Sequence, residues 1–118
     1  MKAVLFDVDG TLVKLRGAGR AALIAAIAEL FGLEQERVQA EVARIDFRGA
    51  TDRRIVGTLM ELLQLDGDAR VHHVFERYVL RLQQTVHERG GELLPGVDGL
   101  VRLLEQRADV IVGLLTGN

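Results

Sequence analysis

Two short, continuously apolar segments at opposite ends of the chain constrain the fold most strongly. Residues 3–6, extended by Val8, and residues 110–115 have the length and composition of strands that are buried on both faces, as in a parallel sheet. Two parallel strands need a crossover connection between them. Turn-forming residues follow each segment: Asp9-Gly10-Thr11 after the first and Thr116-Gly117-Asn118 after the second. We therefore predict an α/β fold that contains a parallel sheet.

Most of the residues between these segments have helical periodicity. Residues 23–31 place their apolar side chains on one face of a helix, and Gly32 is a suitable stop. The side chains of Thr51 and Asp68 can accept hydrogen bonds from backbone N–H groups at helix N-termini. The other predicted helices here are residues 35–45, a helix capped by Thr51, and a longer helix that runs from Asp68 to Gly90-Gly91.

A last predicted helix begins after Pro95 and Gly96 and leads directly into the second strand segment. This helix can serve as the crossover between the two parallel strands. The helices before it then form an insertion after the first strand. We expect one domain from residues 1–14 and 92–118 and a helical domain from residues 15–91.

The composition excludes several classes of site and partner. The chain is 48% hydrophobic and 27% charged with a net charge of -2, and it lacks the basic footprint of a nucleic-acid binder. It has no cysteine, which excludes disulfides, thiolate metal sites and thiol catalysis. The N-terminal apolar run is too short for a signal peptide, and no stretch has the length of a membrane span. We expect a cytoplasmic protein without nucleic-acid or membrane partners.

Asp7 and Asp9 lie two residues apart at the end of the first strand segment. This spacing directs both side chains to the same side, at the edge where open α/β sheets bind ligands. Two close carboxylates need a cation, and Mg²⁺ commonly bridges carboxylates to phosphate. A carboxylate can be the nucleophile in phosphoryl transfer, and a second one can transfer the proton. Gly10 would let the backbone approach the ligand closely.

The segment Phe6-Asp7-Val8-Asp9-Gly10-Thr11-Leu12 resembles the signature of the haloacid dehalogenase (HAD) superfamily. The resemblance implies a partial HAD-like Rossmannoid core with a parallel sheet. It also implies that Asp7 is the nucleophile, which forms an aspartyl-phosphate, and that Asp9 is the general acid/base. Mg²⁺ would be held by the Asp7 carboxylate and the Asp9 carbonyl. Thr116 matches the family's second motif, and the implied phosphate-binding residues are Gly10, Thr116, Gly117 and Asn118.

The middle of the chain is similar to family members that carry a helical cap between these two motifs. Residues 48–52 (Arg-Gly-Ala-Thr-Asp) resemble a cap segment of the phosphoglycolate phosphatase-like branch, and residues 94–97 (Leu-Pro-Gly-Val) look like the return from cap to core. The resemblance implies hydrolysis of a small phosphorylated metabolite. It makes Arg48 and Thr51 candidate substrate contacts from the cap.

The family's core continues after the second motif with a lysine and with an acidic motif that completes the metal site. We therefore expect this chain to be the N-terminal part of such a protein, with the remaining groups supplied by a C-terminal half or across a homo-oligomer. The alternative for the isolated chain is a module that binds phosphate or metal without turnover. In either case the two strands should have an uncovered apolar surface and be less well ordered than the helices.

The motif residues also have simpler explanations. Asp7 and Asp9 could cap a strand-to-turn junction, since Asp-Gly is a common turn signal. Thr116 could belong to an ordinary loop after a strand. Two related reactions also compete with hydrolysis. A haloacid dehalogenase would not need Asp9, because no alkoxide leaves, whereas a sugar phosphomutase keeps both acids.

Histidines and arginines outside the motifs allow two interpretations as well. His72 and His73 could suggest a metal site, but on a polar helical surface such residues are more often solvated. Arg48, Arg53 and Arg54 could bind an anionic substrate, or they could form a solvated face.

Overall fold

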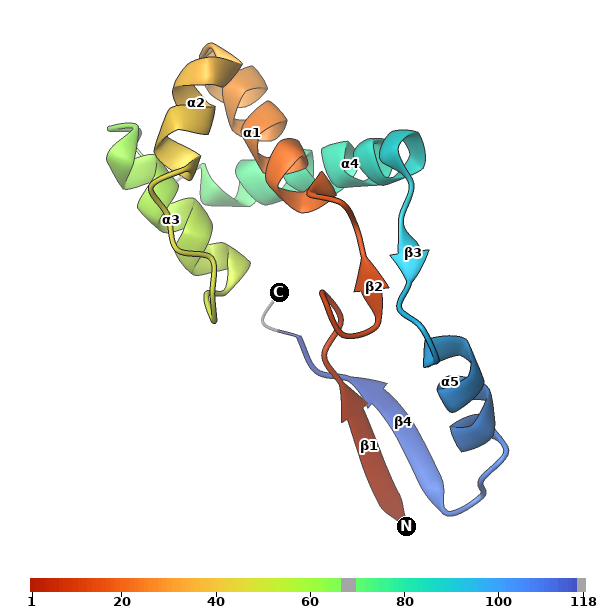
Figure 1. Cartoon of the computed structure of the whole chain (residues 1–118). Coiled ribbons are helices and arrows are strands. Elements are labelled where there is room, and N and C mark those ends of the chain that lie inside the picture. The colour runs from red at the N-terminus through yellow and green to blue at the C-terminus, as the bar shows by residue number, and fades with distance from the viewer. Residues whose placement is uncertain (67–69, 117–118) are drawn as a thin grey trace. The chain divides into compact units, whose positions relative to one another are not determined.

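The computed structural model describes residues 1–66 and 70–116, and these residues form two compact units. One unit contains Met1–Arg16 and Gly90–Thr116, and the other contains Gly17–Arg89. The first unit has strands and one helix, and the second is helical (Figure 1). The structure is therefore mixed α/β.

The strand-containing unit is built on a parallel pair of strands from the two ends of the chain. β1 (Lys2–Phe6) pairs in parallel with β4 (Val110–Leu114), with Lys2 opposite Val110 and Phe6 opposite Leu114. α5 (Val97–Glu105) precedes β4 and contacts it (Figure 1). The predicted parallel pair and its helical crossover are confirmed.

β1 ends two residues earlier than predicted, because the carbonyl of Val8 turns into a tight loop. This oxygen accepts N–H hydrogen bonds from Thr11, Leu12 and Val13 at 3.3, 2.9 and 3.2 Å. A peptide group with these three partners takes no part in the β1–β4 ladder. Extending the strand prediction to Val8 was therefore wrong.

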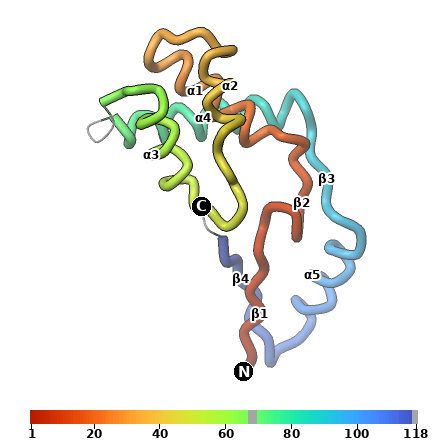
Figure 2. Tube along the Cα trace, turned by 60° about the vertical axis from the view of Figure 1, so that its left-hand side comes forward, coloured from red at the N-terminus to blue at the C-terminus, as the bar shows by residue number. Residues whose placement is uncertain are grey.

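A second, two-residue strand pair follows this loop and was not predicted. β2 (Val13–Lys14) pairs antiparallel with β3 (Glu92–Leu93), and the two run side by side in Figures 1 and 2. The side chains of Arg16 and Glu92 approach to 3.6 Å beside this ribbon. Strands this short give no period-2 pattern that a sequence could reveal.

The two strands are largely exposed, although their apolar composition is typical of strands that are buried on both faces. Leu5 is 57% exposed, Ile111 57% and Leu114 65%. Among the described residues, the sheet has only the two strands β1 and β4, and α5 is the helix that contacts it. The expected uncovered apolar surface is confirmed.

The helical unit contains four helices whose positions largely follow the predicted periodicity: α1 (Ala18–Phe31), α2 (Gln35–Val42), α3 (Asp52–Leu62) and α4 (Val71–Arg89). α1 ends at Gly32, whose φ of 63° is left-handed and suits glycine. The Thr51 hydroxyl accepts the N–H of Arg54 at 3.3 Å, so the N-cap of α3 is confirmed. α2 ends at Val42 rather than Ile45, and Asp68 lies outside the described residues.

Among the described residues, every buried side chain lies in this helical unit. Seven of them are both large and almost inaccessible to solvent, and they come from all four helices. The helical unit therefore has its own hydrophobic core. No helix in the described part of the chain combines the length and apolarity needed to cross a membrane. The seven residues are Ile27, Val38, Val42, Val56, Leu59, Met60 and Val74.

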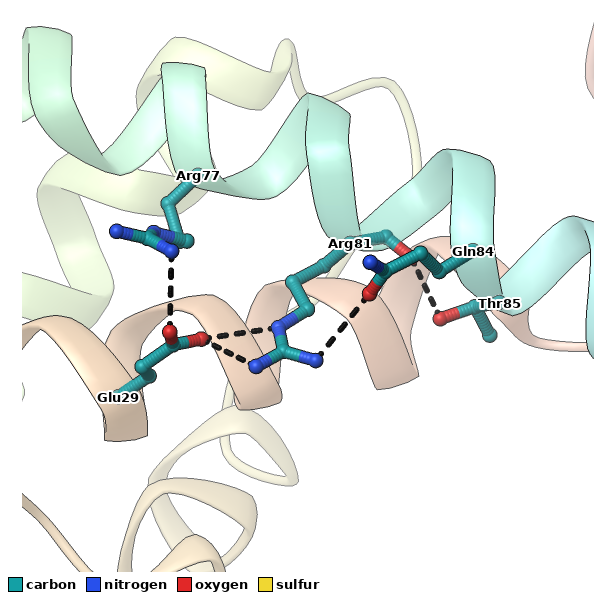
Figure 3. A network of polar contacts seen from close by, with 5 residues as sticks. All are labelled: Glu29, Arg77, Arg81, Gln84 and Thr85. Atoms are coloured by element: carbon teal, nitrogen blue, oxygen red, sulfur yellow. Dashed lines mark hydrogen bonds and ion pairs between the residues drawn. The ribbon is translucent and has the colours of Figure 1, made fainter.

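An ion-pair network joins α1 to α4 at the surface of this unit (Figure 3). Arg77 donates to Glu29 Oε1 at 3.0 Å, and Arg81 donates to Glu29 Oε2 through Nε at 2.9 Å and also through Nη2. Arg81 also reaches Gln84 Oε1 at 3.2 Å. The hydrogen bond from Arg81, followed by the charges of Arg77 and Arg81, lowers the pKa of Glu29.

Candidate active site

The candidate site starts at the carboxyl ends of β1 and β4, which lie next to each other because the strands are parallel and in register. The N–H of Leu115 donates to the carbonyl of Phe6 at 2.8 Å, one residue beyond the paired strands. Asp7 directly follows Phe6, and Thr116 directly follows Leu115. The backbone thus brings two segments more than 100 residues apart in sequence to one edge of the sheet.

The loop after β1 is closed by backbone hydrogen bonds, which hold the backbone that carries its side chains. Gly10 donates to the carbonyl of Val13 at 2.9 Å, opposite the bonds that Val8 accepts. Gly10 has φ of 76°, a left-handed conformation that glycine adopts without steric cost. A Cβ at Gly10 would meet no atom within 4 Å, so space is open above this peptide. The loop therefore presents Asp7 and Asp9 beside an uncrowded backbone.

Asp7 and Asp9 are both exposed, and Asp7 has a side-chain partner within the loop. The hydroxyl of Thr11 donates to Asp7 Oδ2 at 2.9 Å. Sequence reasoning gave Thr11 no role, although a hydroxyl four residues after the carboxylate in a Gly-containing turn was a usable signal.

Thr11 also lines a mostly apolar pocket. It has a volume of about 400 Å³ and opens between the loop after β1 and the first turn of α5. Sequence reasoning did not predict this pocket, because its walls come from segments far apart in sequence. The lining residues are Phe6, Thr11, Leu12, Pro95, Gly96, Val97, Leu100 and Val101.

The remaining predicted phosphate-binding residues are only partly described. Thr116 is exposed and lies at the carboxyl end of β4. Gly117 and Asn118 lie outside the described residues. The proposed contribution of residues 116–118 to phosphate binding therefore stays a prediction.

Arg48 and Thr51 belong to the helical unit, and each has a local partner there. Arg48 donates to Asp46 through Nε at 3.0 Å and through Nη2 at 2.9 Å, a bidentate ion pair. The hydrogen bond to Asp46 raises the pKa of the Arg48 guanidinium, and the same contact lowers the pKa of Asp46. Phe47, between them, lies under the Arg20 guanidinium at 4.4 Å. The loop before α3 is thus held by charged and cation–π contacts.

The chemistry of the donors at the loop fits magnesium better than a transition metal. Among the described residues there is no cluster of three or more His, Cys, Asp or Glu side chains that could hold a metal ion. Asp7 and Asp9 offer hard carboxylate and carbonyl oxygens, and Mg²⁺ is commonly bound by one or two carboxylates while keeping several waters. The His72–Glu76 contact of 3.2 Å lies on an exposed helical face of α4.

Comparisons with known proteins agree with this fold. A family model of haloacid dehalogenase-like hydrolases matches residues 1–118. Among solved structures, a "putative beta-phosphoglucomutase" from Thermotoga maritima matches with a TM-score of 0.52 and 21% sequence identity. The match covers 98% of this chain and 50% of that chain, so this chain spans half the length of the solved structure.

No curated protein matches the chain closely enough in sequence to be counted as a relative. The solved structure is similar in fold, whereas the family model matches the sequence along its whole length. The chain therefore belongs to the haloacid dehalogenase-like hydrolase family.

Proposed function

We propose that this chain carries the nucleophile of a magnesium-dependent phosphohydrolase that acts on a small phosphate monoester. The observation that carries the proposal is the position of Asp7, directly after β1, where β1 and β4 end together. Ligands of open α/β sheets bind at this edge. Asp9 belongs to the same closed loop, so a nucleophile and a proton donor can face one substrate.

The proposed reaction has two in-line displacements at phosphorus. In the first, an Asp7 oxygen attacks phosphorus, the bond to the alcohol oxygen breaks, and Asp9 protonates the leaving alkoxide. In the second, Asp9 accepts a proton from water, whose oxygen attacks the aspartyl-phosphate. Inorganic phosphate leaves and the Asp7 carboxylate is restored. The Thr116 hydroxyl would donate to a phosphoryl oxygen in both steps.

The proposed magnesium ligands from this chain are the carboxylate of Asp7 and the backbone carbonyl of Asp9. When bound, the ion would offset the negative charge that builds up between the nucleophile and the phosphoryl group. Gly10 follows these ligands, and a Cβ there would meet no atom within 4 Å, so a ligand can approach this backbone closely.

The helical unit is proposed as the cap that selects the substrate. Arg48 would contribute the N–H donors of Nη1, because its pair with Asp46 uses Nε and Nη2 of a guanidinium with five donors. Thr51 lies three residues further on, at the N-terminus of α3. A cap of this kind excludes water from the reaction and adds binding energy remote from phosphorus.

The test is release of inorganic phosphate from a generic aryl phosphate by this chain, with and without Mg²⁺. We expect release that requires Mg²⁺, that is abolished in Asp7→Asn and that is strongly reduced in Asp9→Asn. Asp98→Asn is the matched control, because Asp98 is an exposed carboxylate of the same unit that pairs with Arg102 on α5. Release that persists in Asp7→Asn would contradict the proposal, whereas no release by the unsubstituted chain would favour the module that only binds phosphate or metal.

Two alternatives are separated by two further measurements, which are analysis of the products from a sugar phosphate and of Mg²⁺ binding. A sugar phosphomutase would also use both Asp7 and Asp9, but it would yield an isomeric sugar phosphate without net release of phosphate. A module that only binds phosphate or metal would show saturable Mg²⁺ binding that depends on Asp7 and no product of either kind.

A further inference from the structure

We propose that β4 presents an edge that pairs with the same strand of a second copy of this chain. The proposal does not depend on the reaction of Asp7, so either can fail without the other. In the part of the chain that the structure describes, β4 pairs with β1 and with no other strand. α5 lies on a face of this pair, since its residue Leu100 lines a pocket with Phe6 of β1. An edge with no strand beside it is a template for another strand.

Two hydrogen bonds at the ends of the pair show which backbone groups of β4 point toward β1. The carbonyl of Asp109 accepts the N–H of Lys2 at 2.7 Å. The N–H of Leu115 donates to the carbonyl of Phe6 at 2.8 Å. Backbone groups alternate in direction along a strand, so the odd-numbered residues of β4 point toward β1. The even-numbered residues point outward, and they are Val110, Val112 and Leu114.

These outward groups fit an identical strand that runs antiparallel. The outward residues are spaced symmetrically about Val112, so a two-fold axis at Val112 pairs Val110 with Leu114 of the second copy. Each such pair exchanges two N–H···O bonds, which gives about six new hydrogen bonds. The contact is isologous, as in most homodimers, and it joins two sheets of two strands into one sheet of four. A sheet of three or more strands is more stable than a single pair.

Side chains beside this edge fit the same arrangement. Ile111 is 57% exposed, and in this register it lies opposite Gly113 of the second copy. Leu5 extends over Gly113, because a Cβ at Gly113 would lie 3.1 Å from Leu5 Cδ2. Ile111 would therefore contact Leu5 of the second copy, which is also 57% exposed. Pairing then removes apolar side chains of both copies from water.

The charges around the sheet favour a second copy over a charged partner. β4 contains no charged residue and no proline, which are the usual devices that block an edge. Arg107 and Asp109, just before β4, pair with each other at 2.7 Å within one chain. An apolar edge of this kind offers no charge that would select a charged partner, whereas it is complementary to its own sequence.

The opposite edge, on β1, is a poorer template. The same alternation leaves Ala3 and Leu5 as its outward residues, so two antiparallel β1 strands would exchange only about four hydrogen bonds. Lys2 lies within β1, and lysine is typical of edges that are protected against pairing. The proposal is therefore specific to the edge of β4.

The test is the mass of the unsubstituted chain in solution, measured by sedimentation equilibrium over a range of concentrations. We expect a monomer–dimer equilibrium with a Kd in the micromolar range, as for a small interface. Val112→Pro removes the central outward N–H and no bond to β1, so it should raise the Kd by at least about tenfold. Ala3→Pro is the matched control, because it removes an outward N–H from the other edge. Its Kd should stay within about twofold of that of the unsubstituted chain.

A second pair of variants separates edge pairing from general association of apolar surfaces. Ile111→Lys places a charge beside the edge of β4. Leu103→Lys introduces the same charge at a side chain of α5 that is 60% exposed. We expect the dimer to dissociate in Ile111→Lys and to persist in Leu103→Lys.

Cross-linking does not require that a proline be tolerated in β4. The chain has no cysteine, so Val112→Cys gives one thiol per chain. Directly opposite Cβ atoms of antiparallel strands are about 4.5–5.5 Å apart, within reach of a short bismaleimide. We expect a cross-linked dimer from Val112→Cys and none from Leu103→Cys. A chain that stays monomeric at about 1 mM, a dimer weakened by Ala3→Pro or Leu103→Lys as much as by the changes in β4, or no cross-link at position 112 would overturn the proposal.

Discussion

Replacing Leu59 by alanine tests whether the stability of this chain comes from the helical unit. Leu59 lies on α3, is completely inaccessible to solvent, and belongs to the core cluster formed by all four helices. Removing a buried leucine side chain costs about 2–5 kcal/mol, because apolar contacts are lost and a cavity remains. For a domain of roughly 60–100 residues, each kcal/mol shifts Tm by about 4–8 °C, so a loss of ~3 kcal/mol lowers Tm by roughly 10–25 °C.

The matched control is Leu114→Ala in β4, which makes the same chemical change at a side chain that is 65% exposed. A leucine that is mostly in water loses little on truncation, so we expect a change within about 0.5 kcal/mol. Both variants can be followed by far-UV circular dichroism during thermal and urea unfolding, since most of the described secondary structure is helical. Equal losses in the two variants, or a larger loss in Leu114→Ala, would refute the conclusion that the stabilising core is helical.

Three further outcomes are expected. In hydrogen exchange, the core amides of α1 and α3 should exchange more slowly than the amides of β1 and β4, because these strands contain no buried side chain. Slower exchange in the strands than in the helices would contradict this. The lowered pKa of Glu29 means that its ion pairs stabilise the fold above the ordinary glutamate pKa of about 4.3 and that this stability is lost as pH falls through the lowered value. Urea unfolding should therefore show a stability difference between the unsubstituted chain and Glu29→Gln at neutral pH that disappears in acid; a difference independent of pH would be inconsistent with this cause. Thr51→Ala should destabilise the helical unit by about 1 kcal/mol through loss of the α3 N-cap, and Thr51→Ser should not, as measured by urea unfolding.

The helices and the parallel pair could be predicted from the sequence because both depend on local patterns. The apolar stripe of α1, the stop at Gly32 and the cap at Thr51 each involve residues within a few positions of one another. The run at residues 110–115 predicted β4 in the same way. These features confirm that periodicity and capping residues carry most of the local information.

Other features depend on partners that are distant in sequence, and the sequence did not reveal them. The burial of β1 was predicted from its apolar composition, but composition does not show which elements cover a strand. Val13 finds its ladder partner Leu93 80 residues later. The sequence showed that Arg48 is a cation, but it did not show the bidentate ion pair with Asp46. This pair uses Nε and Nη2 of Arg48, so fewer N–H donors remain for a substrate.

The candidate site was predictable as far as the ends of its two strands, β1 and β4. The spacing of Asp7 and Asp9 after an apolar run located the loop, and the loop is where the structure places both residues beside the end of β4. The hydrogen bond from Thr11 depends on how the turn closes around Val8, which no residue pattern states. Their roles in catalysis remain predictions.

The short antiparallel ribbon of β2 and β3 has a consequence for how this architecture tolerates change. The chain leaves the strand-containing unit at Arg16 and re-enters it at Gly90, and the ribbon fixes these two points close together. The entropy of closing a flexible loop grows only with the logarithm of its length, at roughly 0.6 kcal/mol per doubling. The segment inserted between β2 and β3 can therefore be shortened to a hairpin turn, lengthened, or exchanged for an unrelated domain. Such a change should cost little stability in the pairing of β1 with β4, because the ribbon holds the two ends of the insertion together. Diversification of such a chain is expected to concentrate in the inserted segment, while the loop that bears Asp7 stays the same.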